Sequence, residues 1–128
     1  MEFQYDPDKH PDPKEWLALD EDERLLAVEE YHKKRRIRLP NARLHAVIHV
    51  IVENQVALGD EIPAKPTLLR LVQEGLDRHD ALHALGSVLA AHLFDLLKAG
   101  PQGADSNAKY FDGLRRLTVE SWRQSGSG

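Results

Sequence analysis

Histidines occur in two pairs that share one spacing. His45 and His49 are separated by three residues, and His79 and His83 repeat this spacing further along the chain. In a helix, residues four apart lie on the same face, about one turn apart. Two imidazoles placed in this way can direct nitrogens to one point about 2 Å from each, which is the geometry of zinc ligation. The spacing therefore predicts a metal site that takes ligands from two helices.

Carboxylates accompany both pairs. Glu53 lies one turn after His49, and Asp80 directly follows His79. A carboxylate in either position can complete a ligand set or hold a ligating histidine in orientation. Glu53 lies further from the apolar stripe of its helix and is expected to be the more exposed. We predict a metal site with five members, which are His45, His49, Glu53, His79 and His83.

The ligand chemistry limits the cofactor. The sequence contains no cysteine, which excludes thiolate zinc sites, iron–sulfur clusters and a cysteine nucleophile. Imidazole-rich sites suit zinc, iron, copper and nickel better than magnesium or calcium, and zinc or iron is the first expectation. A di-iron carboxylate bundle requires Glu-x-x-His on two helices, and this pattern is missing. The sequence also lacks glycine-rich phosphate loops, so no nucleotide or organic cofactor is expected.

The second pair has a further interpretation. His79-Asp80-x-x-His83 is similar to the His-Glu-x-x-His motif of zinc proteases, in which the acid activates the metal-bound water. Aspartate is one methylene shorter than glutamate, and this difference argues against proteolysis. The pattern leaves open whether the protein is an enzyme.

A structural role is the alternative for the histidines. Histidines at helix edges commonly bond to carboxylates or carbonyls of the next helix, and such a buried network fixes helix register. The chain would then be a non-catalytic interaction or adaptor module, dimeric, with Trp122 on the last helix available to a partner. The sequence leaves this function and metal binding both open.

A basic run occupies residues 33–38, with five cations in six residues. Such a run can bind nucleic-acid phosphates, but here no aromatic residues are interleaved for base stacking. The same predicted helix begins with the acidic residues 21–23, which would repel a nucleic acid. We interpret the run as a solvated helix end that complements the helix dipole, and nucleic acid is not an expected partner.

The histidine pairs require helices to position them. Asp20 and Glu23 form a capping-box pattern at a helix start, and Gly59 is typical of a left-handed helix end. The first 19 residues are proline-rich and predict an irregular start, with a short turn from Pro13. We predict an all-α fold, a compact bundle of about five helices over residues 21–36, 42–58, 67–76, 78–98 and a last helix after Ser106.

Bulk composition sets the domain organisation. The chain has 128 residues, of which 41% are hydrophobic and 30% charged, with a net charge of −4. These values predict one globular domain over residues 1–124 and a disordered tail at 125–128. The acidic start lacks the features of a signal peptide, and no run of about 18 apolar residues predicts a membrane span. We expect a cytoplasmic protein.

A family resemblance covers about residues 39–117. The segment 39–55, which begins LPNARLH and carries His49 and Glu53, is similar to a bacterial domain family of unknown function. His79-x-x-x-His83 and the motif YFDGLRRL at 110–117 fit the same family. The resemblance implies a small helical cytoplasmic protein with two His-x-x-x-His helices and no assigned activity. Family members carry an acid where this chain has Ser87, which implies a weaker or differently completed metal site here.

Overall fold

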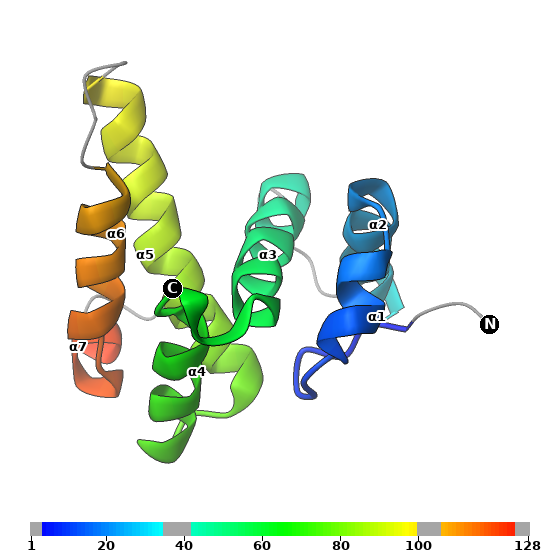
Figure 1. Cartoon of the computed structure of the whole chain (residues 1–128), viewed down its shortest axis with the longest axis horizontal. Helices are drawn as coiled ribbons and strands as arrows, with labels where there is room; N and C mark the ends of the chain where they lie inside the picture. The colour runs from blue at the N-terminus through cyan, green and yellow to red at the C-terminus, as the bar shows by residue number, and fades with distance from the viewer. Residues whose placement is uncertain (1–3, 35–41, 100–105, 125–128) are drawn as a thin grey trace.

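Most of the described residues are helical (Figure 1). A computed structural model describes residues 4–34, 42–99 and 106–124, and within these ranges it contains no strand. The all-α prediction is confirmed, with seven helices of which five are long. The helices are α1 (Pro13–Ala18), α2 (Glu21–Lys34), α3 (Ala42–Ala57), α4 (Ala64–Gln73), α5 (Arg78–Ala99), α6 (Ser106–Arg116) and α7 (Val119–Gln124), with a short 3₁₀ helix η1 (Gly59–Glu61).

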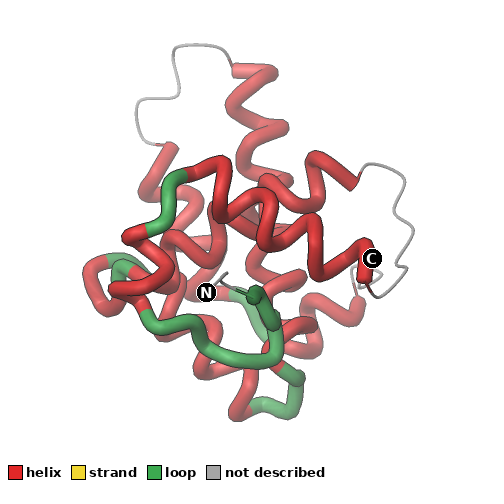
Figure 2. The backbone as a smooth tube through the Cα atoms, turned by 90° about the vertical axis from the view of Figure 1, so that its right-hand side faces the viewer, coloured by secondary structure: helices red, strands yellow, loops and turns green. Residues whose placement is uncertain are grey.

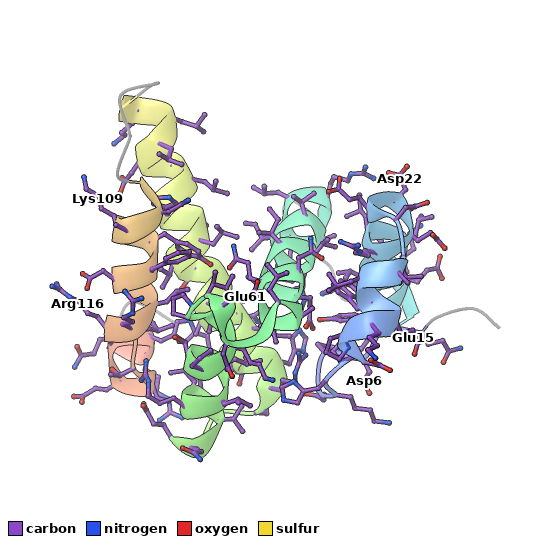
Figure 3. The ribbon with its side chains drawn as sticks, in the orientation of Figure 1. Asp6, Glu15, Asp22, Glu61, Lys109 and Arg116 are labelled. Atoms are coloured by element: carbon purple, nitrogen blue, oxygen red, sulfur yellow. The ribbon has the colours of Figure 1, made fainter. Side chains whose placement is uncertain are left out.

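Helix α3 is the central element. It packs against α1 and α2 on one side and against α4 and α5 on the other, while α6 packs against α4 and α5. Figure 1 shows this order, with α2 and α5 separated by α3, and Figure 2 shows the helices from the α1–α2 side. Charged side chains such as Asp22, Lys109 and Arg116 point away from the bundle (Figure 3).

Local signals define the ends of several helices. The backbone amide of Glu23 donates to Asp20 Oδ1 at 2.8 Å, and the amide of Asp20 donates to Glu23 Oε1 at 3.1 Å. This reciprocal pair is the predicted capping box, and it satisfies two backbone donors at the start of α2. Gly59 adopts φ 75°, a left-handed conformation that glycine tolerates, directly after α3. Both sequence signals are confirmed.

Two apolar clusters form the interior, and α3 contributes to both. The larger cluster joins α3 to α4, α5, α6 and α7 and includes Val52 and Leu85. The smaller one joins α3 to the N-terminal segment, α1 and α2, and includes Val50 and Trp16. Burial on two sides explains why α3 is strongly apolar around its whole circumference. It also leaves the polar side chains of α3 few positions that reach solvent.

A glycine sets the distance between α3 and α5. A Cβ atom built on Gly86 would lie 3.0 Å from Ile48 Cγ2, which is closer than side chains normally approach. The small residue one turn beyond His83 therefore permits close helix packing. This close approach holds the histidine pair of α3 near that of α5.

Helix α5 is long and apolar enough, by length and composition alone, to cross a membrane. The sequence prediction recognised no such segment. The core helix of a globular protein passes the same test, and α5 packs against α3, α4 and α6. It also places the charged residue Arg78 in the protein interior.

Other sequence expectations need correction or lie outside the described residues. The predicted last helix is two helices, α6 and α7, and Trp122 is 7% exposed, so it is not available to a partner surface as expected. Residues 35–38 of the basic run and the tail 125–128 lie outside the described ranges. Their predicted roles stay predictions.

Candidate metal centre

Five histidines from three helices meet between α2, α3 and α5. The two predicted pairs face each other, with ring centroids of His45 and His83 5.0 Å apart and those of His49 and His79 5.4 Å apart. The fifth histidine is His32 of α2, whose ring lies 4.9 Å from that of His45 and 5.5 Å from that of His49. We call this set the histidine cluster; its members are His32, His45, His49, His79 and His83.

Within the cluster, two groups of three could hold a metal ion. One consists of His45, His49 and His83, and the other of His32, His49 and His79, with the ligand nitrogens of each group within 4.8 Å of one another. Ligand atoms around a tetrahedral zinc ion are about 3.3 Å apart. This value falls within the separations found in both groups, so either group could hold an ion. His49 belongs to both groups and is the centre of the cluster.

Sequence reasoning missed His32. It has no histidine partner at the i+4 spacing, so the search for pairs passed over it. A signal was nevertheless present, because Leu25, Val28 and His32 follow helical spacing along the apolar stripe of α2. The structure buries His32 on this stripe, facing α3.

All five Nε2 atoms in the cluster are buried and unpaired. None of them has a hydrogen-bond partner among the residues that the structure describes. A buried polar atom without a partner costs about 1–3 kcal/mol. Five such atoms would together cost about 5–15 kcal/mol, which equals the whole stability of a typical domain. The five nitrogens are therefore available as ligands for an ion within the cluster.

The hydrogen bond made by His32 fixes its tautomer. Its Nδ1 atom lies 2.8 Å from the carbonyl oxygen of Val28. A carbonyl can only accept, so Nδ1 must carry the proton and donate it. In the neutral ring, Nε2 then holds a lone pair directed into the cluster. Metal-ligating histidines are oriented in this same way by a carbonyl or carboxylate.

Tyr5 fixes the tautomer of His49 in a similar way. The Tyr5 hydroxyl donates to Glu53 Oε2 at 2.6 Å and lies 3.0 Å from His49 Nδ1. Burial, followed by the charge of Glu53, raises the Tyr5 pKa well above its ordinary value, so the hydroxyl keeps its proton. Because that proton points to Glu53, His49 Nδ1 must be the donor to the Tyr5 oxygen. In the neutral ring, His49 Nε2 therefore also carries a lone pair.

Glu53 lies behind the cluster in a buried ion pair. Its carboxylate accepts from Arg78 Nη1 and Nη2, both at 2.8 Å, in addition to Tyr5. Only 1% of the Glu53 residue surface is exposed, so the expectation that it is the more exposed residue is wrong. The arrangement has Glu53 orient Tyr5, which in turn orients His49. This corresponds to the orienting role that the sequence allowed for a carboxylate.

Four imidazoles of the cluster have pKa values below the ordinary value of histidine. Burial, with repulsion from neighbouring imidazoles, lowers the pKa of His45 and of His83 to about 4. The same causes lower the pKa of His49 well below its ordinary value. Burial also lowers the pKa of His79, although nearby acids such as Asp8 partly offset the effect. Neutral imidazoles are the form that binds a metal ion.

A metal ion satisfies these nitrogens better than water does. One water molecule donates two hydrogen bonds, so it can serve two lone pairs at most. A transition-metal ion accepts lone pairs from three or four ligands at once. The donor set contains only imidazole nitrogens, which suits zinc, copper, iron or nickel rather than calcium or magnesium. The histidine cluster therefore fits a transition-metal ion.

Asp80 and two further histidines, His92 and His10, have partners outside the cluster. The backbone amide of Asp80 donates to Asp77 Oδ1 at 2.8 Å, in the cap at the start of α5, and the described residues show no hydrogen bond from Asp80 to the cluster. His92 stacks on Tyr110 of α6 with centroids 5.3 Å apart. His10, in the N-terminal segment, accepts a hydrogen bond from Arg78 at its Nδ1 atom.

In comparisons with protein-family models, curated proteins and solved structures, no match to the chain was found. The resemblance to a bacterial domain family stays a prediction. Inferences about the chemistry of the site therefore depend on its geometry.

Protonation of the cluster gives the metal-free protein a defined pH dependence. In the unfolded chain a histidine titrates near pH 6.5, whereas His45 and His83 titrate near 4 in the folded protein. Between these values the unfolded state binds more protons, so stability falls as the pH drops from about 6.5 to about 4. Denaturant unfolding in the presence of a chelator measures this loss. A His45→Gln/His83→Gln variant should lose stability less steeply, and His92→Gln should behave like the wild type. A flat wild-type profile would contradict neutral, buried imidazoles.

Proposed function

We propose that this protein binds one transition-metal ion per chain in the histidine cluster, with zinc or iron as the first candidates. The observation that carries the proposal is the set of five buried Nε2 atoms, none with a partner among the described residues. The Nε2 atoms of His32 and His49 carry lone pairs, because the Nδ1 atoms of these two rings hold the protons and donate hydrogen bonds. The pre-oriented tautomers support metal binding over a structural hydrogen-bond network, which would pair the nitrogens with one another.

The shared ligand supports a stoichiometry of one. His49 has a single nitrogen for the cluster, because its Nδ1 atom is bonded to Tyr5. It belongs to both groups of three ligands, so both groups cannot be complete at the same time. A single ion bound by one group has further histidines within reach as additional ligands. Three protein ligands also leave a coordination position for water or another small molecule.

Metal titration of individual variants tests the proposal. Protein prepared without a histidine tag should bind zinc at one equivalent by calorimetry and elemental analysis, and should not bind magnesium. His49→Gln removes a ligand from both groups and should weaken zinc binding by about 100-fold or more. His83→Gln leaves the group of His32, His49 and His79 intact and should weaken binding less. His92→Gln is the matched control. Equal affinities for all four proteins would contradict the proposal.

Tyr5 provides a test of the orienting network. Removing its hydroxyl in Tyr5→Phe leaves His49 Nδ1 without its partner, which releases the ring from its tautomer and orientation. Loss of an outer partner of this kind lowers metal affinity by about 10- to 100-fold. Competition between the protein and a chromogenic chelator measures the change. Tyr110→Phe, which removes a hydroxyl bonded to Gln55, should leave zinc affinity unchanged. An unaltered zinc affinity in Tyr5→Phe would contradict the role of Tyr5 in orienting His49.

The second candidate is an interaction module that dimerises, and exposed apolar residues favour it. Phe94 is 59% exposed and Leu97 84% exposed on the C-terminal half of α5. In Figure 1 this half of α5 extends beyond α3 and has α6 beside it. Leu93 lies one turn from Leu97 on the same face. Apolar groups collected in this way are typical of contact surfaces.

Light scattering coupled to size-exclusion chromatography tests this candidate. A dimer that uses α5 should dissociate in the variant Phe94→Glu/Leu97→Glu, because two carboxylates would be buried in the contact. The variant Leu26→Glu changes another exposed leucine, on α2, and is the control. A wild-type protein that elutes as a monomer at high concentration would contradict dimerisation. Metal binding is measured separately, so the two functions are tested independently.

A further inference from the structure

A cavity of about 400 Å³ lies beside the buried ion pair of Glu53 and Arg78. Its walls come from the N-terminal segment and α1, from the C-terminal end of α3, and from α4. Figure 1 shows these elements on the lower side of the bundle in that view. The volume is in the range of pockets that bind small molecules. None of the five members of the histidine cluster lines this cavity.

Most of the wall is apolar and rigid. Pro11, Pro13 and Trp16 form one side, and Val56 and Leu69 contribute to the opposite side. The Trp16 indole N–H donates to Asn54 Oδ1 at 2.9 Å, so the polar edge of the ring is satisfied. The Trp16 ring is 0% exposed, so it lies behind the wall, and the accessible apolar surface comes from the two prolines and Leu69. Proline rings have little conformational freedom to lose, and they suit a flat, compact apolar body.

Two hydrogen-bond donors lie in the same wall. The ammonium group of Lys65 has no hydrogen bond or ion pair within the described part of the chain. His10 Nδ1 accepts from Arg78 Nε at 3.2 Å, so in this ring the proton lies on Nε2 and makes that atom a donor. Burial, followed by the Arg78 charge, lowers the His10 pKa, in agreement with a neutral ring.

The charges around the cavity favour an anion. Glu53 also lines it, but its carboxylate is paired with the two Arg78 nitrogens at 2.8 Å. The ion pair therefore adds no net charge. Lys65 supplies the remaining charge among the lining residues, and it is positive. A bound molecule thus meets apolar walls, two donors and one unpaired cation.

We propose that this cavity is a binding site for a small carboxylic acid with a compact aromatic or similarly flat apolar body. The carboxylate binds Lys65 and His10, and the apolar body packs against the two prolines and Leu69, next to the buried Trp16 ring. The site is separate from the histidine cluster, so this proposal does not depend on metal binding. The network of Glu53, Arg78 and Tyr5 lies between the two sites.

Phenylacetate is the probe, with phenylethanol and phenethylamine as analogues that keep the ring but carry a neutral or a positive head. Heteronuclear NMR of the intact protein follows the indole N–H signals of its two tryptophans. Phenylacetate should shift the Trp16 signal with saturation, while the Trp122 signal in α7 is an internal reference. Phenylethanol should bind more weakly, and phenethylamine should bind least.

Two variants at the cavity wall test the role of charge. Lys65→Met should weaken phenylacetate binding by about tenfold, because it removes the cation that binds the carboxylate. Its effect on phenylethanol should be small. Leu69→Asp places a carboxylate at an exposed wall position and should reverse the preference from phenylacetate to phenethylamine. Lys109→Met, on α6, makes the same change of net charge far from the cavity and should have no effect.

Three results would overturn the proposal. The first is the absence of a saturable Trp16 shift with any of the probes. The second is equal binding of phenylacetate and phenylethanol, which would mean that the head group is not recognised. The third is an equal loss of phenylacetate affinity in Lys65→Met and Lys109→Met. Each result is obtained with folded protein, because Lys65, Leu69 and Lys109 all lie at positions with access to solvent.

Discussion

The buried ion pair between Glu53 and Arg78 is the constraint on which the site depends. It joins α3 to the start of α5, and Arg78 also donates to the Pro7 carbonyl at 2.9 Å and to His10. Breaking one member of such a pair leaves an uncompensated buried charge and costs about 3–5 kcal/mol. A pair of this kind is weak evidence for stability, but it specifies one arrangement of the elements it joins. Here it holds the N-terminal segment against α3, and with it the hydroxyl that orients His49.

The histidine cluster follows from that arrangement. Three helices are brought together closely enough for five imidazoles to meet, and the contact of Gly86 with Ile48 keeps α3 and α5 near each other. Burial lowers the pKa of His45, His49, His79 and His83. The hydrogen bonds to Val28 and Tyr5 direct two lone pairs inward. A hydrophobic interior gains nothing from five unpaired nitrogens. Two groups of three imidazoles in this interior could hold an ion, and this geometry supports the proposed metal centre.

The sequence predicted much of this structure, and its failures have physical causes. Helical periodicity and local caps such as Asp20 with Glu23 are short-range features, so they identified the all-α fold and most helix positions. The i, i+4 spacing likewise identified His45, His49, His79 and His83. Long-range contacts could not be read from the sequence. His32 joins the cluster from α2 and has no local histidine partner. The burial of Glu53 depends on its ion pair with Arg78, which is 25 residues further along the chain. A residue's exposure on one helix cannot be derived when its partner is on another.

X-ray absorption spectroscopy of the zinc-loaded protein tests the central claim most directly, because it reports the ligand atoms themselves. The structure predicts a first shell dominated by nitrogen at about 2.0–2.1 Å, with the outer-shell scattering of at least three imidazoles and no sulfur. The same spectrum recorded on His49→Gln should lose imidazole scattering. A first shell of oxygen atoms, or fewer than three imidazoles in the wild-type protein, would contradict a metal centre in the histidine cluster.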